Sequence, residues 1–189
     1  KSLFPVMRKY QFLVMTLCLI SLSSFNWTTL SSTSPKTDAM VADWERAKAY
    51  TLEYLNASTD EAIVFKPTPE MRTFRQQMLH LAEANYGFAS AASGKASPIA
   101  FGDLEGSADE YKTKEALTKA VVDSYDFTID ALKAMDESRM NESIKMFNRF
   151  EMTREAAFHK AFEHQTHHRG QTTVYLRLSG IQPPNEKLF

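Results

Sequence analysis

The segment "TREAAFHKAFEHQTHHRGQTTVYLRLSG", Thr153–Gly180, has the pattern of one long helix. Thr153 can cap its first turn and Gly180 can end it, because helices favour threonine as an N-cap and glycine just after the last turn. Helices pack a stripe of residues spaced by four and three positions against their neighbours. We therefore expect His164 and His168 to face the interior of a helical bundle. That stripe consists of Ala157, Ala161, His164, His168, Gln171, Tyr175 and Leu178.

Three upstream segments also repeat apolar residues near the helical period. Thr68-Pro69 is a start signal for the second helix, and the S-x-x-E spacing of Ser107 and Glu110 is one for the third. Two long connections are expected, a loop before Ser107 and a mixed segment, Asp136–Met152, with a short helical turn or an extended piece. Four amphipathic helices with two long connections predict an all-α four-helix bundle. The expected helices cover about 37–56, 69–93, 107–135 and 153–179.

Composition supports a single helical domain. The chain has 189 residues, 43% of them hydrophobic, and only 6 glycines and 7 prolines, which favours helices over a β-fold with many turns. The formal net charge of −1 gives no basic surface for nucleic acid, so no nucleic-acid partner is expected. We expect a flexible lead-in over 25–36, the bundle over 37–184 and a C-terminal tail over 185–189.

Residues 1–24 are interpreted as a signal peptide with an upstream leader. From Met7, Arg8 and Lys9 precede an apolar run, Phe12–Leu22, and small polar residues follow, which is the pattern of a secretory signal. The run is shorter than the about 20 residues of a membrane span. We therefore expect export to the periplasm or the cell exterior and no stable membrane span after cleavage, with an uncleaved anchor as the alternative. The only cysteine, Cys18, lies in this run, so neither a disulfide nor cysteine catalysis is expected in the mature chain.

A third histidine is expected to face the same interior from the second predicted helix. The same steps align His80 with small residues, namely Ala84, Gly87 and Ala91, and the fourth helix adds Ala157 and Ala161. Small side chains beside inward histidines indicate a space, because a tightly packed core would fill it. Three neutral imidazoles can hold Zn²⁺, Ni²⁺, Fe²⁺ or Mn²⁺ and leave a fourth position for water, whose pKa the metal can lower to about 7. Spacing alone leaves core histidines with buried partners as the alternative.

Other polar residues near this stripe are weaker candidates. Glu83, one turn beyond His80, is a candidate general base or an acceptor for a ligand N–H, and a surface acid is the simpler alternative. His159 and His167 lie off the stripe and are expected in solvent or outside the ligand set. Tyr175 either bonds to a ligand or belongs to the core. Arg169 is expected to have a structural role.

The segment "HQTHHRGQTTVYLRLSGIQPP", His164–Pro184, resembles the C-terminal signature of the DinB-like superfamily, which includes proteins described as metal-dependent hydrolases. "FKPTPEMRTFRQQMLHLAEANYGF", Phe65–Phe88, resembles the family's helix with a single histidine. The resemblance covers about 37–184. It implies a four-helix bundle with up-down-down-up topology and a divalent metal bound by one histidine of the second helix and two of the fourth. By motif, these ligands are His80, His164 and His168.

Three functions follow from the resemblance. The first is a metal-dependent hydrolase with a small-molecule substrate, and the second is a stress-associated metal-binding protein without catalysis. The third is a thiol-dependent S-transferase or isomerase, since the family includes enzymes that use low-molecular-weight thiols. Export disfavours the third, because such thiols are kept reduced in the cytosol. A small bundle of this kind is also compatible with a homodimer.

Overall fold

The fold was described from a computed structural model, which places residues 35–189. The predicted signal peptide and nearly all of the predicted lead-in lie outside these described residues. Four long helices pack together and confirm the predicted bundle: α2 (Pro35–Ala57), α4 (Phe74–Ser93), α6 (Lys114–Lys133) and α7 (Arg154–Leu178). The shorter elements are α3 (Asp60–Ile63), α5 (Asp103–Gly106), η1 (Ala108–Glu110), η2 (Glu137–Arg139), β1 (Ser143–Met146) and β2 (Phe150–Thr153).

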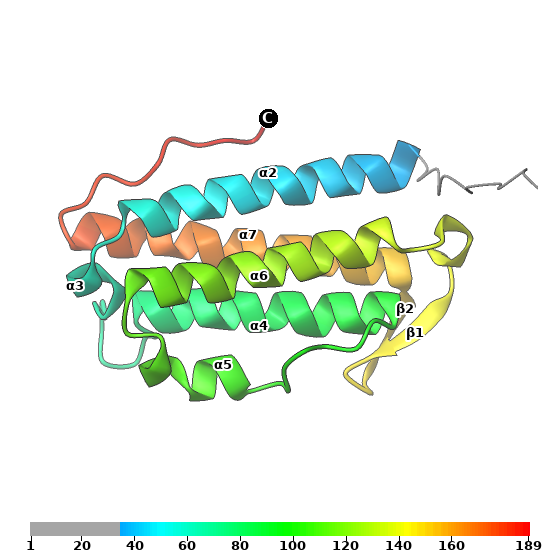
Figure 1. Ribbon diagram of the computed structural model, residues 1–189, viewed down its shortest axis with the longest axis horizontal. Helices are drawn as coiled ribbons and strands as arrows, with labels where there is room; N and C mark the ends of the chain where they lie inside the picture. Colours follow the sequence, from blue (N-terminus) through cyan, green and yellow to red (C-terminus); the bar gives the residue numbers. More distant parts are fainter. Residues whose placement is uncertain (1–34) are drawn as a thin grey trace, which may run out of the picture. The chain divides into compact units, whose positions relative to one another are not determined.

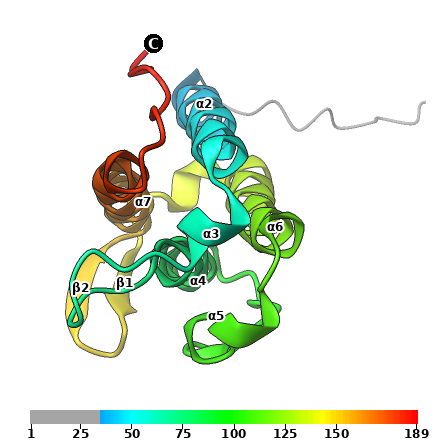
Figure 2. The same cartoon turned by 90° about the vertical axis from the view of Figure 1, so that its left-hand side faces the viewer.

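The helices follow the up-down-down-up order (Figure 1). Helices α4 and α6 run in the same direction, so the connection between them must return along the whole bundle, and α5 and η1 lie on this path. Helices α2 and α7 run in the opposite direction. In the end-on view of Figure 2 the four helices surround one core, with α5 and the β1–β2 hairpin outside it. Helix α4 contacts both α6 and α7, so α4 and α7 are antiparallel neighbours.

Threonines start three of the long helices, but two of the predicted starts are wrong. Thr153 caps α7 as predicted, with its side chain accepting from the N–H of Ala156. Helix α4 begins after Thr73, not Thr68, because Thr73 and Gln76 form a reciprocal capping box that satisfies two free N–H groups. Gly94 ends α4 in a left-handed conformation, as predicted.

The third helix also starts later than predicted. The side chain of Ser107 makes no capping bond, and the segment from Ala108 to Glu110 forms a 3₁₀ turn instead of the first turn of an α-helix. Asp109 in this turn is paired with Arg75 of α4 at 2.9 Å, which ties the turn to the neighbouring helix. Thr113 then caps α6 through the N–H of Ala116.

The mixed segment after α6 contains both predicted features. It holds the short turn η2 and an antiparallel hairpin in which Met146 pairs with Phe150 and Ser143 with Thr153. Two turn residues, Phe147 and Asn148, have positive φ of 50° and 56°. The hairpin lies beside α4 and α7, outside the four-helix core (Figure 2).

The core is aromatic and aliphatic. Trp44 of α2 is 1% exposed and meets Tyr125 of α6 edge-on, with ring centroids 5.7 Å apart. Tyr125 also bonds to Thr51 at 2.7 Å and donates to Gln165 of α7 at 2.9 Å, which satisfies its buried hydroxyl. Burial of each large apolar side chain contributes about 1.5–3 kcal/mol to the free energy of unfolding. The bundle therefore has a stabilising core that is separate from any ligand site.

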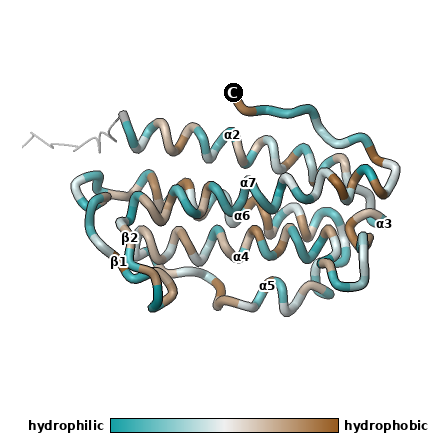
Figure 3. Tube along the Cα trace, turned by 180° about the vertical axis from the view of Figure 1, so that it is seen from behind, coloured by the Kyte–Doolittle hydropathy of each residue, from teal (hydrophilic) through white to brown (hydrophobic). Residues whose placement is uncertain are grey.

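Hydrophilic and hydrophobic residues alternate along all four helices, as Figure 3 shows. Within residues 35–189, no helix has the length and apolar character needed to cross a membrane. The C-terminal tail returns along α2 (Figure 1). The backbone carbonyl of Lys187 accepts a hydrogen bond from Arg46, and the ammonium group of Lys187 pairs with Glu53.

Candidate metal centre

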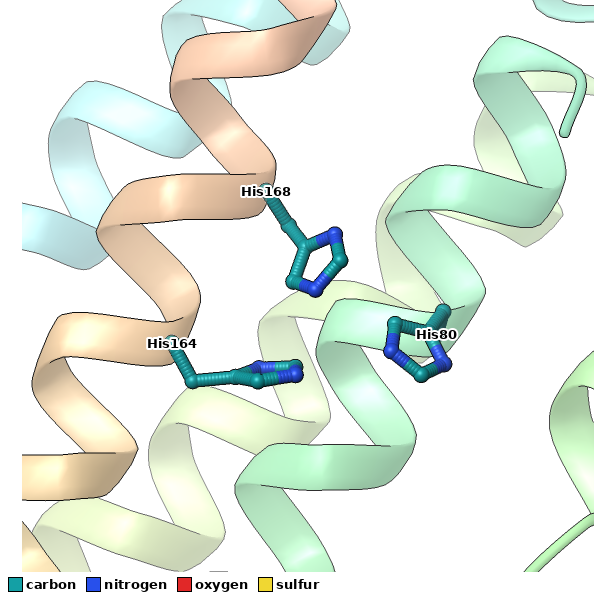
Figure 4. Close-up of side chains that lie close together, drawn as sticks. All are labelled: His80, His164 and His168. Atoms are coloured by element: carbon teal, nitrogen blue, oxygen red, sulfur yellow. The ribbon is translucent and has the colours of Figure 1, made fainter. Parts of the chain in front are cut away.

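Three histidines from two helices meet beside the bundle core. His80 comes from α4, and His164 and His168 lie one turn apart on α7. One ring nitrogen of each lies within 4.8 Å of the other two, and Figure 4 shows the three rings turned toward a common point. The ring centroid of His168 is 4.3 Å from that of His164 and 4.6 Å from that of His80. The interior stripes of two antiparallel neighbours produce this convergence, as the sequence predicts.

The two histidines that α7 contributes to the cluster, His164 and His168, are neutral near pH 7. Burial lowers the pKa of His164 to about 4, and the adjacent His80 and His167 add repulsion against a second positive charge. Burial likewise lowers the pKa of His168 to about 3, with His164 as the next cause. Neutral imidazole is the form that binds metal, because the ligand nitrogen must be free of its proton. These two imidazoles can therefore bind a cation without having to release protons.

A carboxylate that the sequence did not reveal orients His80. Glu105 of α5 lies 2.9 Å from Nδ1 of His80, and Arg72 holds the other oxygen of Glu105 at 2.5 Å. Burial raises the pKa of Glu105, but the hydrogen bonds from Arg72 and His80 outweigh it, so this pKa is lowered and the group is ionised. An ionised acceptor fixes the proton on Nδ1 and leaves Nε2 of His80 free for a ligand, as in carboxylate–histidine–metal arrangements.

Glu83 is buried, which contradicts one of its sequence interpretations. Its side chain is 3% exposed, so the alternative of a surface acid is wrong. One oxygen accepts from the N–H of Glu105 at 3.4 Å, and the other is buried without a hydrogen-bond partner. Burial raises the pKa of Glu83, with the nearby carboxylate of Glu105 adding to the effect. Glu83 thus supports α5, which carries Glu105, and Glu105 is the carboxylate that contacts a histidine.

The remaining candidates lie around the cluster. His167 is exposed and bonds to Gln171 of the same helix, and His159 is exposed and paired with Glu155 at 3.5 Å. Tyr175 is 2% exposed and donates to the carbonyl of Arg72 at 3.0 Å, so it belongs to the core. Arg169 is buried, donates to Gln165 and lies over the ring of Tyr50, which is the structural role expected for it.

Cavities open on both sides of the cluster, but small helix residues do not form them. Ala157 and Ala161 are packed in the core, contrary to the prediction that they leave a space. A cavity of about 460 Å³ lies between α7 and the hairpin and reaches His164. A second, of about 640 Å³, reaches His168 from the side of Arg72 and Glu105. The histidines are therefore accessible from an apolar side and from a polar side.

The donor set fits a divalent cation. Three imidazole nitrogens at this separation are the ligands that Zn²⁺, Ni²⁺, Fe²⁺ and Mn²⁺ accept. The Nδ1 atoms of His164 and His168 are buried without a hydrogen-bond partner, so neither ring is held by a competing protein contact through that atom.

Comparisons with known proteins agree with the observed fold. The model of the DinB superfamily matches residues 43–172, a range that includes all three histidines. A DinB-like protein from Bacillus cereus has a similar solved structure, with 18% identity, a TM-score of 0.64 and coverage of 79% of this chain and 97% of that one. A DinB-like protein from Bacillus subtilis has 23% identity, a TM-score of 0.59 and coverage of 80% and 96%. Comparison with curated protein sequences gives no match.

Proposed function

Because the chain belongs to the DinB superfamily, we propose that it is a hydrolase that depends on a divalent metal and acts on a small molecule. The observation that carries this proposal is the convergence of three imidazoles, two of them held neutral, on one point beside open cavities. A divalent ion bound there would supply a Lewis acid and lower the pKa of a water molecule that it binds.

The residues of the chain have distinct parts in this proposal. His80, His164 and His168 would hold the ion, and because all three are imidazoles, the ligands themselves would not neutralise its positive charge. Glu105 accepts from Nδ1 of His80, so Nε2 would be the nitrogen available to the ion. The partly exposed edges of His80 and His164 leave the site open to a substrate.

The position of the site favours catalysis over a purely structural metal. The main core, which includes Trp44, Tyr125 and Leu176, is built mainly from buried hydrophobic side chains of the four long helices. A structural metal site carries the folding free energy of its domain, so such a domain unfolds when the metal is removed. We expect this bundle to stay folded without metal.

The test measures hydrolysis of a panel of esters and amides by protein loaded separately with each of the four metals. His168→Ala should abolish turnover while the circular dichroism spectrum stays helical, and His159→Ala serves as the matched control because His159 is exposed and outside the cluster. Equal turnover in the wild-type and His168→Ala proteins would reject the proposed function. Absence of turnover together with unfolding on chelation would support a non-catalytic, structural metal instead.

We also propose that the protein is exported, on the basis of the pattern in residues 7–24. These residues lie outside the described part of the structure. N-terminal sequencing of the protein recovered from cell fractions tests the proposal. A start after Ser24 in an exported fraction supports cleavage, and an intact N-terminus in the membrane fraction supports the uncleaved anchor.

A further inference from the structure

The cavity between α7 and the hairpin has features that metal binding alone does not require. Its volume is about 460 Å³, within the usual range for small-molecule sites. Two methionines and three phenylalanines form most of its wall, and we call it the hairpin pocket. These residues are Phe88, Met146, Phe147, Phe150 and Met152.

The hairpin pocket is continuous with the histidine cluster. His164 lines the pocket and is also one of the three converging imidazoles. The ring of Phe88 lies 5.8 Å from that of His164, and the ring of Phe147 lies 5.3 Å from that of Phe88. A molecule in the pocket would therefore touch an imidazole of the cluster.

The wall offers apolar contacts and no unpaired charge. Lys160 and Glu163 also line the pocket, but they are paired with each other at 2.6 Å. Aromatic rings and methionine thioethers adapt well to alkyl and aryl groups. Burial of apolar surface would thus be the main contribution to binding here.

The hairpin keeps apolar rings at the surface beside this pocket. Phe147 is 52% exposed and Phe150 is 50% exposed, although burying them would be favourable. Phe147 also has a φ of 50°, a strained conformation for a bulky residue, and such strain is concentrated at ligand sites. Exposed apolar residues around a concave wall are a feature of interaction sites, ligand-binding grooves among them.

We propose that the hairpin pocket binds the alkyl or aryl part of a substrate whose reactive group lies at the three histidines. This inference rests on the proposed function, since it names the substrate class of the same site. A small molecule is the occupant that fits, because the pocket leads to the histidine cluster. The substrate is therefore an amphiphilic molecule with a polar, reactive end and an apolar end.

Binding of alkyl hydroxamates to the cobalt-loaded protein tests this, because the hydroxamate group binds a metal with an open position. We expect affinity to increase about fourfold with each added methylene from acetohydroxamate to hexanohydroxamate. Phe150→Ser should remove most of this increase without changing the affinity for acetohydroxamate. Phe189→Ser is the matched control, since Phe189 is fully exposed at the C-terminus. The visible spectrum of cobalt gives each Kd.

Each outcome decides between the two proposals. An affinity independent of chain length, or an equal dependence in wild type and Phe150→Ser, overturns the pocket and leaves the metal function intact. If acetohydroxamate fails to bind, the proposal that the metal has an open coordination position is wrong. The pocket is then tested on metal-free protein by the fluorescence of bound anilinonaphthalene sulfonate. Equal binding of this probe by both proteins overturns the pocket. A wild-type dimer that Phe150→Ser converts to a monomer would also overturn it, because a second copy would then cover the pocket.

Discussion

Replacing Glu105 by alanine tests how much the orientation of His80 contributes to metal affinity. The carboxylate lies 2.9 Å from Nδ1 of His80 and is anchored by Arg72, so its loss frees the proton of His80 to move to Nε2. Loss of such an acceptor typically lowers metal affinity 10- to 100-fold, or by about 1.4–2.7 kcal/mol. The Glu105 side chain is 31% exposed, and solvent screening weakens its charge. We therefore expect the lower half of this range, roughly 10- to 30-fold.

The assay is a cobalt titration at neutral pH with a competing chelator. Glu105→Gln should lose less affinity than Glu105→Ala, because an amide oxygen can still accept from Nδ1–H although the charge is gone. Glu110→Ala is the matched control, since Glu110 is an exposed acid on η1, close in sequence. Nitrogen NMR of the metal-free protein adds a direct readout of the His80 tautomer. We expect the ring proton on Nδ1 in the wild type and exchange of that proton between Nδ1 and Nε2 in Glu105→Ala.

A Kd for Glu105→Ala within threefold of the wild-type value would refute the orienting role of this hydrogen bond. The same would follow if Glu110→Ala lost as much affinity as Glu105→Ala, because a general loss of negative charge would then explain both. The melting temperature of each metal-free variant checks that α5 still packs on α4.

Two further predictions concern stability. The metal-free protein should lose stability as pH falls from about 6.5, because the pKa values of His164 and His168 are lowered to about 4 and about 3 and the unfolded chain binds protons that the folded chain does not. Urea unfolding at neutral and mildly acidic pH should show a loss of up to about 2 kcal/mol per imidazole, and an equal pH dependence after replacing both histidines by glutamine contradicts this. Tyr125→Phe should destabilise the fold by about 1–2 kcal/mol, since it removes a buried hydroxyl that donates to Gln165, and an unchanged urea midpoint would show that this bond contributes nothing.

Helix periodicity predicted most of the fold and the cluster of histidines. The spacing of His164 and His168 places both on one stripe of α7, and the pattern around His80 places it on the interior stripe of α4. Stripes are local properties of a helix, so they can be read without knowing the neighbours. Helix starts were less predictable, because Thr68 and Thr73 are both acceptable caps and only the reciprocal bonds with Gln76 select Thr73.

The sequence by itself determined that four amphipathic helices form a bundle and that three histidines face its interior. Only the tertiary structure decided which carboxylate accepts from His80. Glu105 lies on a short helix in a connection without periodicity, and it meets His80 only after that connection folds back over α4. The same holds for the apolar pocket, whose wall is completed by a hairpin that reaches His164 through packing on α4 and α7. Contacts of this kind depend on the path of the chain in space, and no local pattern of residues encodes that path.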